Sequence, residues 1–315
     1  MNQSEVEGRI DKRIVVPLDG SALAERVLPV AGHLSQSLGA SIELLLVVET
    51  PVEEIPQEIS ALAATDADNY LKQKIKILAE TVDEKKLSYS VQTGHPASLI
   101  IECAESGKST LILMSSHVHS GMQRLLLGSV AGKVVQAATT PVLLIPANAR
   151  SPEVDLVEFQ RMIVPLDGSK LAECVLPHAT DLCKALDMEL ILVRCYDPNF
   201  PGASVRMHDV SKIVHDSAEN YINSKVEELK ARGMTKISYR IFRGSPAAQI
   251  TDFAVETPNS LIAMCTHGRH GIGRWMLGSV THAFIHCSEE PVLVIRGTAR
   301  DKGWPELNAD PKDRR

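Results

Sequence analysis

The strongest constraint on the fold of this chain is that its sequence repeats once along its length. RIVVPLDGS at Arg13–Ser21 returns as RMIVPLDGS at Arg161–Ser169, 148 residues later. HPASLI, LLGSV and PVLLIP of the first half match SPAAQI, MLGSV and PVLVIR of the second half, in the same order and at an offset of 150. A unit of this length is too long for a solenoid repeat and has the size of an ordinary domain. We therefore predict two domains, residues 1–150 and 151–315, with a polar tail from about residue 297.

Within each unit, short aliphatic runs alternate with amphipathic stretches. Ile14–Leu18 and Ser41–Val48 predict strands, whereas the apolar spacing of Ala22–Leu38, of Leu171–Leu186 and of Val280–Cys287 predicts helices. Hydrophobic residues make up 44% of the chain but aromatic residues only 4%, so the strands are aliphatic, as in a parallel sheet that is buried on both faces. The expected fold class is α/β, with two doubly wound five-stranded parallel-sheet domains in tandem.

The charge and cysteine content exclude several classes of partner. The net charge is −6, and no basic stripe is visible in either half, so we expect no nucleic-acid partner. No apolar run reaches the roughly 18 residues of a membrane span. The polar start MNQSEVEGRIDKR lacks the apolar core of a signal peptide, and the six cysteines form no CxxC pair. These features predict a cytoplasmic protein with no membrane partner.

The loop after the first strand of each unit is a candidate ligand site, because open α/β sheets bind ligands at the carboxyl ends of their strands. This loop reads PLDGS in both units, and it contains Asp19 in the first and Asp167 in the second. The aspartate could accept hydrogen bonds from a ribose or a base. Alternatively, the aspartate and the serine could serve only to form the turn and cap the next helix. The sequence leaves both interpretations open.

The loop after the fourth strand of the second unit is rich in glycine. It reads CTHGRHGIGRWMLGSV from Cys265 to Val280. Glycines allow a backbone to approach a ligand closely, and Gly278-Ser279 opens a helix whose free N–H groups favour an anion. Arg269 and Arg274 add positive charge nearby. The loop is neither a Walker A motif nor a dinucleotide fingerprint, but it predicts a phosphate site.

The second unit resembles the universal stress protein domain, whose nucleotide-binding members carry G-x2-G-x9-G-[ST] after strand 4 and an aspartate after strand 1. Gly268, the nine residues that follow it and Gly278-Ser279 match the motif, and Asp167 matches the aspartate. The resemblance covers about residues 12–146 and 160–296, as in tandem members of the family. It implies an adenine nucleotide alpha hydrolase-like fold and a role in a cytoplasmic stress response or signalling, with ATP bound, with or without Mg²⁺. The implied nucleotide-binding residues are Pro165, Leu166, Asp167, Val193, Met264, Gly268, Arg269, Gly271, Gly278, Ser279 and Val280.

The two units depart from the motif to different degrees. Cys265 replaces its first glycine in the second unit, whereas Ser115 and Val118 replace its first two glycines in the first unit. A left-handed backbone at a β-branched residue costs roughly 1–2 kcal/mol, so valine is a poor substitute there. We predict that the C-terminal unit binds nucleotide and that the N-terminal unit binds it weakly or not at all. The weaker candidates in the first unit are Asp19, Gly128, Ser129 and Val130.

Catalysis and metal binding have little support in the sequence. No G-x-S-x-G elbow occurs, nor do the SGGxDS and HxGH signatures of ATP pyrophosphatases and nucleotidyl transferases. We assign no catalytic residue and expect at most slow ATP hydrolysis, with Asp167 and magnesium as the candidate groups. The loop histidines lack a Cys or carboxylate at ligand spacing, so no metal site is assigned. The alternative function is a nucleotide-free tandem scaffold that mediates protein–protein contacts.

The last strand predicted in each unit is an apolar edge. These strands are Val142–Ile145 and Val292–Ile295, and an uncovered apolar edge favours pairing with another strand. Members of the family that this chain resembles pair through that strand as dimers. We therefore expect the two units to pair with each other inside one chain, as a pseudo-two-fold monomer. A further homodimer stays open.

Overall fold

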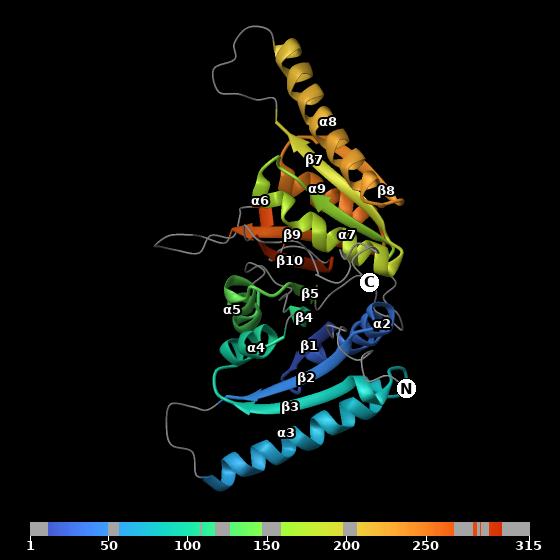
Figure 1. Cartoon of the computed structure of the whole chain (residues 1–315). Coiled ribbons are helices and arrows are strands. Elements are labelled where there is room, and N and C mark those ends of the chain that lie inside the picture. The colour runs from blue at the N-terminus through green and yellow to red at the C-terminus, as the bar shows by residue number, and fades with distance from the viewer. Residues whose placement is uncertain are drawn as a thin grey trace, which may run out of the picture.

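A computed structural model describes residues 12–49, 57–107, 109–116, 127–146, 159–197, 207–267, 280–281, 284 and 290–297. In these residues the two units together form a single ten-stranded sheet, to which each contributes five strands (Figure 1). The strands are β1 Lys12–Leu18, β2 Ser41–Val48, β3 Leu87–Thr93, β4 Ser109–Ser116, β5 Val142–Pro146, β6 Arg161–Pro165, β7 Glu189–Tyr196, β8 Ile237–Arg243, β9 Ser260–His267 and β10 Val292–Gly297. Their order is β3-β2-β1-β4-β5-β10-β9-β6-β7-β8, and all neighbours within one unit are parallel. The α/β fold class predicted from the sequence is confirmed.

Helices cover both faces of the sheet because successive side chains of a buried strand point to opposite sides. In β1, Ile14 and Val16 pack with the helices that follow the first two strands, and Val15 packs with those that follow the next two. The helices of the first face are α1 Ala22–Glu25, α2 Leu28–Leu38, α3 Gln57–Leu78, α6 Lys170–Glu173, α7 Val175–Leu186 and α8 Met207–Ala231. Those of the second face are α4 Pro96–Glu105, α5 Ser129–Ala137 and α9 Pro246–Glu256. A short 3₁₀ helix, η1 Glu84–Lys86, precedes β3.

The prediction of one continuous helix after the first strand of each unit is wrong. The structure divides Ala22–Leu38 into α1 and α2, and Leu171–Leu186 into the end of α6 and α7. Pro29 and Pro177 explain the breaks: each lacks the N–H that would bond the carbonyl four residues earlier, and its ring crowds that carbonyl. Those carbonyls belong to Glu25 and Glu173, the last residues of α1 and α6.

The two units meet at an antiparallel pair formed by β5 and β10. Leu143 is paired with Leu293, and the flanking pairs are Val142 with Val294 and Leu144 with Val292. Leu143 and Leu293 are equivalent residues of the repeat, so the pair is related by an approximate two-fold axis. α5 packs on both strands, because Val292 and Val294 belong to the same apolar cluster as its buried residues. The helices α2 and α7 also touch across this seam.

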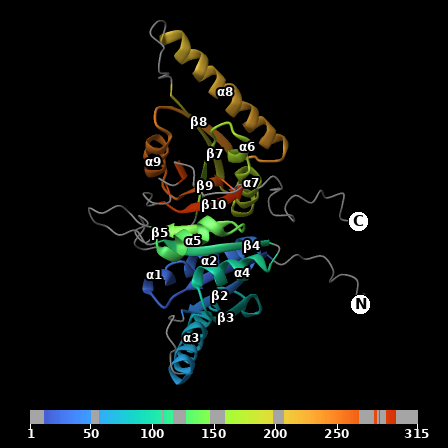
Figure 2. The same ribbon diagram turned by 90° about the vertical axis from the view of Figure 1, so that its left-hand side faces the viewer.

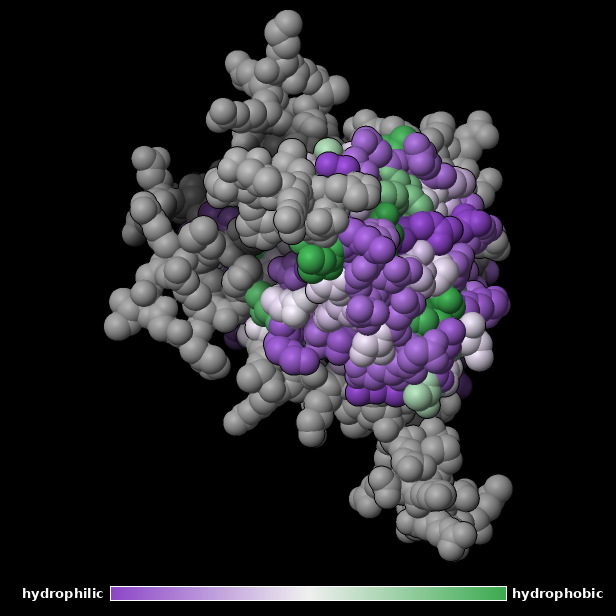
Figure 3. All heavy atoms as spheres, turned by 90° about the horizontal axis from the view of Figure 1, so that it is seen from above, coloured by the Kyte–Doolittle hydropathy of each residue, from purple (hydrophilic) through white to green (hydrophobic). Residues whose placement is uncertain are grey.

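The long helices α3 and α8 lie at opposite ends of the molecule, next to the edge strands β3 and β8 (Figures 1 and 2). Seen from the α8 end, the described surface is mostly hydrophilic, with apolar side chains scattered over it (Figure 3).

Of the helix predicted over Val280–Cys287, the structure describes Val280, Thr281 and Phe284, all of them helical. No helix in the described part of the chain has the length and apolar character that a membrane crossing requires.

Candidate functional site

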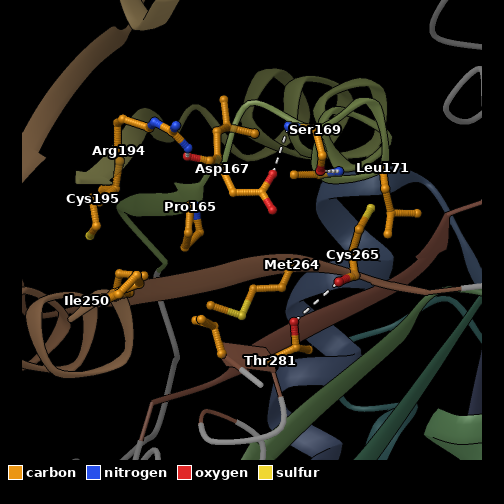
Figure 4. Close-up of a pocket in the computed structure, with 15 residues that line it drawn as sticks. Pro165, Asp167, Ser169, Leu171, Arg194, Cys195, Ile250, Met264, Cys265 and Thr281 are labelled. Carbon is orange, nitrogen blue, oxygen red and sulfur yellow. Dashed lines mark hydrogen bonds between the residues drawn. The ribbon is translucent and has the colours of Figure 1, made fainter. Parts of the chain in front are cut away.

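A cavity of about 290 Å³ lies at the carboxyl ends of β6, β7 and β9 in the second unit (Figure 4). Parallel α/β sheets bind ligands at this edge. Every predicted nucleotide-binding residue that the structure describes lines the cavity: Pro165, Leu166, Asp167, Val193, Met264 and Val280. The other predicted residues, Gly268, Arg269, Gly271, Gly278 and Ser279, lie outside the described residues. The described residues of the predicted set thus line one cavity, while nucleotide binding by them and by the glycine loop stays a prediction.

The Asp-Gly-Ser turn after β6 holds Asp167 at the cavity. One carboxylate oxygen accepts a hydrogen bond from the Ser169 N–H at 2.8 Å, and the Ser169 hydroxyl accepts one from the Ala172 N–H at 3.1 Å, which caps α6. Gly168 has a φ of +85°, a conformation that favours glycine. The carboxyl group of Asp167 points into the cavity (Figure 4). The turn-forming interpretation is thus correct for Ser169 and for one oxygen of Asp167, and ligand binding stays a prediction for the other oxygen.

The pKa of Asp167 lies below its usual range. Partial burial alone would raise the pKa, but hydrogen bonds from Ser169 and the positive charge of Arg194 outweigh that effect. An ionised carboxylate accepts hydrogen bonds and donates none, and Asp167 is fully ionised at neutral pH. The cavity therefore presents a fixed hydrogen-bond acceptor to hydroxyl or N–H groups of a ligand.

The remaining walls of the cavity are mostly apolar. Val193, Ile250 and Met264 contribute aliphatic and thioether surface from β7, α9 and β9. The Thr281 hydroxyl donates to the Cys265 carbonyl at 3.3 Å and so ties the helix after the glycine loop to the end of β9 (Figure 4). Burial raises the pKa of the Cys195 thiol to about 11, so Cys195 is a neutral wall residue rather than a nucleophile. An apolar slot with one fixed carboxylate suits a flat, partly polar ligand.

Several residues of this cavity were not predicted from the sequence. Arg194 and Cys195 line it but belong to no motif, and Ile250 lines it as the last residue of the repeated block SPAAQI, which the sequence did not assign to the site. The strand register could have found Arg194 and Cys195: Pro165 pairs with Val193, so the two residues after Val193 reach the same edge of the sheet. Ile250 reaches the cavity from α9.

The first unit contains an equivalent cavity of about 320 Å³. All four weaker candidates line it: Asp19, Gly128, Ser129 and Val130. Asp19 accepts hydrogen bonds from the N–H and the hydroxyl of Ser21, at 2.9 and 2.6 Å. Glu49 supplies a second carboxylate, and no cationic side chain lines the cavity among the described residues. Its charge is therefore less favourable to a phosphorylated ligand than that of the second cavity, where Arg194 offsets Asp167.

The described residues offer little to a metal ion by themselves. Nowhere in that part of the chain do three or more His, Cys, Asp or Glu side chains gather in a group that could hold one. Mg²⁺ in proteins commonly combines one or two carboxylates with waters and substrate phosphates. Asp167 fits that pattern as a single carboxylate, so a magnesium ion at this edge would depend on a bound nucleotide for its other ligands.

Comparisons with known proteins agree on one family. The model of the universal stress protein family matches residues 12–146 and 158–296. A universal stress protein of Methanocaldococcus jannaschii is 34% identical over 140 residues, which cover 42% of this chain and 81% of that protein. One of Mycolicibacterium smegmatis is 20% identical over 306 residues, covering 92% and 99%. The crystal structure of a universal stress protein from Archaeoglobus fulgidus has a TM-score of 0.65 at 21% identity, over 90% of this chain and 98% of that one. This last likeness shows the fold.

Proposed function

The chain belongs to the universal stress protein family, as two domains in tandem, and on that premise we propose that its C-terminal unit binds ATP and that the protein acts in a cytoplasmic stress response or signalling. The observation that carries the proposal is the cavity at the ends of β6, β7 and β9. Its lining includes each described residue that the resemblance to the family assigns to the nucleotide, and Asp167 is held there as an ionised acceptor.

The described residues suggest how each part of the nucleotide is recognised. Val193, Ile250 and Met264 would enclose the apolar faces of the base, and Asp167 would accept a hydrogen bond from the ribose or the base. The sequence assigns the phosphates to the glycine loop and to the helix that Gly278-Ser279 opens. A magnesium ion would neutralise phosphate charge near Asp167. We assign no catalytic residue and expect at most slow hydrolysis.

We propose that the N-terminal unit binds ATP at least about tenfold more weakly than the C-terminal unit, or does not bind it at all. Each unfavourable term is worth about 1 kcal/mol or more: a valine where the motif needs a glycine, and an acidic lining with no offsetting cation among the described residues. The two units would then have separate roles, and the second would be the one that binds ATP.

The seam between β5 and β10 supports a third element of the proposal, that the two domains pair within one monomer in solution.

The protein as purified offers a direct test of ATP binding. Mass spectrometry of the small molecules released on denaturation should find ATP or ADP, at about one per chain or less. Calorimetric titration of nucleotide-free protein should then give one ATP site, and Gly278→Asp should abolish it by placing a carboxylate and a Cβ at the proposed phosphate position. Unchanged ATP binding in Gly278→Asp would refute the assignment.

The N-terminal unit favours a second candidate function for its own half of the chain. Ser115 lines its cavity where the motif has a glycine, and Val118 stands at the next glycine position. A nucleotide-free scaffold would need neither glycine. If no nucleotide is released from purified protein and titration gives no heat, the scaffold function replaces ATP binding for the whole chain.

A further inference from the structure

Arg194 is the charged residue that most clearly distinguishes the C-terminal cavity from its N-terminal counterpart. β1 and β2 are registered as Arg13 with Ser41, and β6 and β7 as Arg161 with Glu189, so the two units superimpose at an offset of 148 along these strands. At that offset Arg194 corresponds to Leu46. Leu46 packs against the apolar core of its unit, whereas Arg194 lines the cavity beside Asp167.

The guanidinium of Arg194 bonds to the end of β6. Its Nη1 donates to the Leu166 carbonyl at 3.1 Å, and the Leu166 N–H donates to the Val193 carbonyl at 2.8 Å. In the first unit the strand register continues to the pair Leu18 with Leu46, whereas in the second it ends one pair earlier, at Pro165 with Val193. The arginine side chain therefore holds the backbone at the point where strand pairing stops and the Asp-Gly-Ser turn begins.

Three side chains, Tyr221 and Lys225 of α8 and Glu173 of α6, form a platform that holds this guanidinium in place. Its Cζ lies 5.6 Å from the ring centroid of Tyr221, close enough for a cation–π interaction. The Tyr221 hydroxyl donates to Glu173 at 3.1 Å, and the Lys225 ammonium lies 3.1 Å from the other oxygen of Glu173. Glu173 and Lys225 are only 13% and 14% exposed, so this group is a fixed part of the fold.

The first unit carries the same platform without the arginine. Tyr70 donates to Glu25 at 3.0 Å, and Lys74 lies 2.7 Å from Glu25. There the cation over the tyrosine ring is Lys74, at 5.2 Å from its centroid. Since the tyrosine, glutamate and lysine persist in both units, the platform alone does not require an arginine. Arg194 is the added component, and it lies beside the predicted binding turn of the unit that keeps the glycine loop.

The guanidinium of Arg194 lies next to the turn that carries Asp167. Its Nη2 would lie 3.6 Å from a Cβ at Gly168, so the charge sits directly against the turn that carries the aspartate (Figure 4). Its Nε is buried and has no hydrogen-bond partner among the described residues. The other titratable groups near Asp167 are Tyr221 of α8, Cys195 of β7 and Cys265 of β9, with Lys170 and Glu173 of α6 behind the turn.

We propose that Arg194 is a positioning residue of the C-terminal cavity: it fixes the Asp-Gly-Ser turn and holds the Asp167 carboxylate as the acceptor for the ribose or base of a nucleotide. The identity of the ligand rests on the proposed function. The effect on Asp167 does not, because it acts through contacts within the protein.

Two measurements on the full-length protein test this role. The first follows the Asp167 side-chain carboxyl by carbon NMR as the pH is changed, with the resonance assigned by its loss in Asp167→Asn. Arg194→Leu, which installs the residue of the first unit, should move the titration midpoint upward, because burial then acts with less opposition. Arg194→Gln, which keeps a hydrogen-bond donor without the charge, should also move it upward and serves if the leucine variant does not fold. Lys74→Leu, which removes the cation over the tyrosine of the first unit, should leave the midpoint unchanged.

The second measurement is a double-mutant cycle on ATP affinity. Arg194→Leu should weaken ATP binding about tenfold, since an acceptor that has lost its alignment loses most of a charge-assisted hydrogen bond. In the Asp167→Asn background the same substitution should have little further effect. An unmoved Asp167 midpoint in both Arg194 variants, or fully additive losses of affinity, would overturn the positioning role. A midpoint that moves in a protein that binds no ATP would instead refute the proposed function and leave the role of Arg194 standing.

Discussion

Replacing Leu293 by alanine tests whether the two units share one structural core. Leu293 is 1% exposed and pairs across the seam with Leu143, which is fully buried. Both belong to one apolar cluster that continues from β1 in the first unit to β6 in the second. Shortening either side chain should therefore destabilise the whole molecule, because the cavity that it leaves is lined by residues of both units.

The expected magnitude follows from the burial of the two leucines. A fully buried Leu→Ala substitution lowers the free energy of unfolding by about 2–5 kcal/mol, the larger values arising where the surroundings cannot collapse. A leucine held between a central strand pair and a covering helix layer has little room to relax, so we expect about 3 kcal/mol or more. Because the two leucines face each other, the double variant should depart from additivity by about 0.5–3 kcal/mol. Leu62→Ala, at a side chain that is 63% exposed, should change stability by less than about 0.5 kcal/mol.

Urea unfolding followed by circular dichroism measures these effects. Leu143→Ala and Leu293→Ala should lower the midpoint by similar amounts and keep a single transition. Two separate transitions, of which Leu293→Ala moves only one, would show that the units unfold independently and would refute the shared core. A loss below about 0.5 kcal/mol in both variants would contradict the burial itself.

Three further predictions concern the turn and the cavity. Ser169→Ala should lower the free energy of unfolding by about 1 kcal/mol, because it removes the cap that accepts from Ala172, and an unchanged urea midpoint would contradict this. The stability difference between wild type and Asp167→Asn should be present above the unfolded pKa and shrink as the pH falls below about 4, because folding lowers the pKa of this carboxyl; a difference that grows on acidification would reverse the sign. Cys195, with a pKa of about 11, is roughly one part in a thousand thiolate at pH 8, so iodoacetamide should label it slowly in the folded protein, as peptide mass spectrometry would show. Fast labelling of Cys195 under native conditions would place it in a different environment.

The duplicated sequence was sufficient to predict the architecture. Two copies of an alternating aliphatic pattern require parallel sheets, and the apolar last strands, Val142–Ile145 and Val292–Ile295, are the segments that meet in the structure. The Asp-Gly-Ser repeat also predicted that Asp167 lies at the carboxyl edge of the sheet, where it lines a cavity, because an aspartate directly after a strand must lie at that edge.

Other features depend on information that motifs do not carry. The breaks before Pro29 and Pro177 are local and could have been predicted from the missing N–H, but apolar periodicity continues across both and masks them. Arg194 lies in a strand whose aliphatic pattern it interrupts, and its position beside the turn becomes visible only in the tertiary structure, where its Nη1 donates to the Leu166 carbonyl. The Tyr221–Glu173–Lys225 group joins residues about 50 positions apart, a separation that only the tertiary structure brings together.

We propose a single high-affinity nucleotide site, which lies in the second unit. The duplication supplies a matched pair of variants, Asp167→Asn and Asp19→Asn, which change the same atom at equivalent turns. Calorimetric titration should give one ATP per chain in the wild type, an affinity about tenfold weaker in Asp167→Asn and an unchanged affinity in Asp19→Asn. Equal losses in the two variants, or a loss confined to Asp19→Asn, would contradict the assignment of the site to the C-terminal unit.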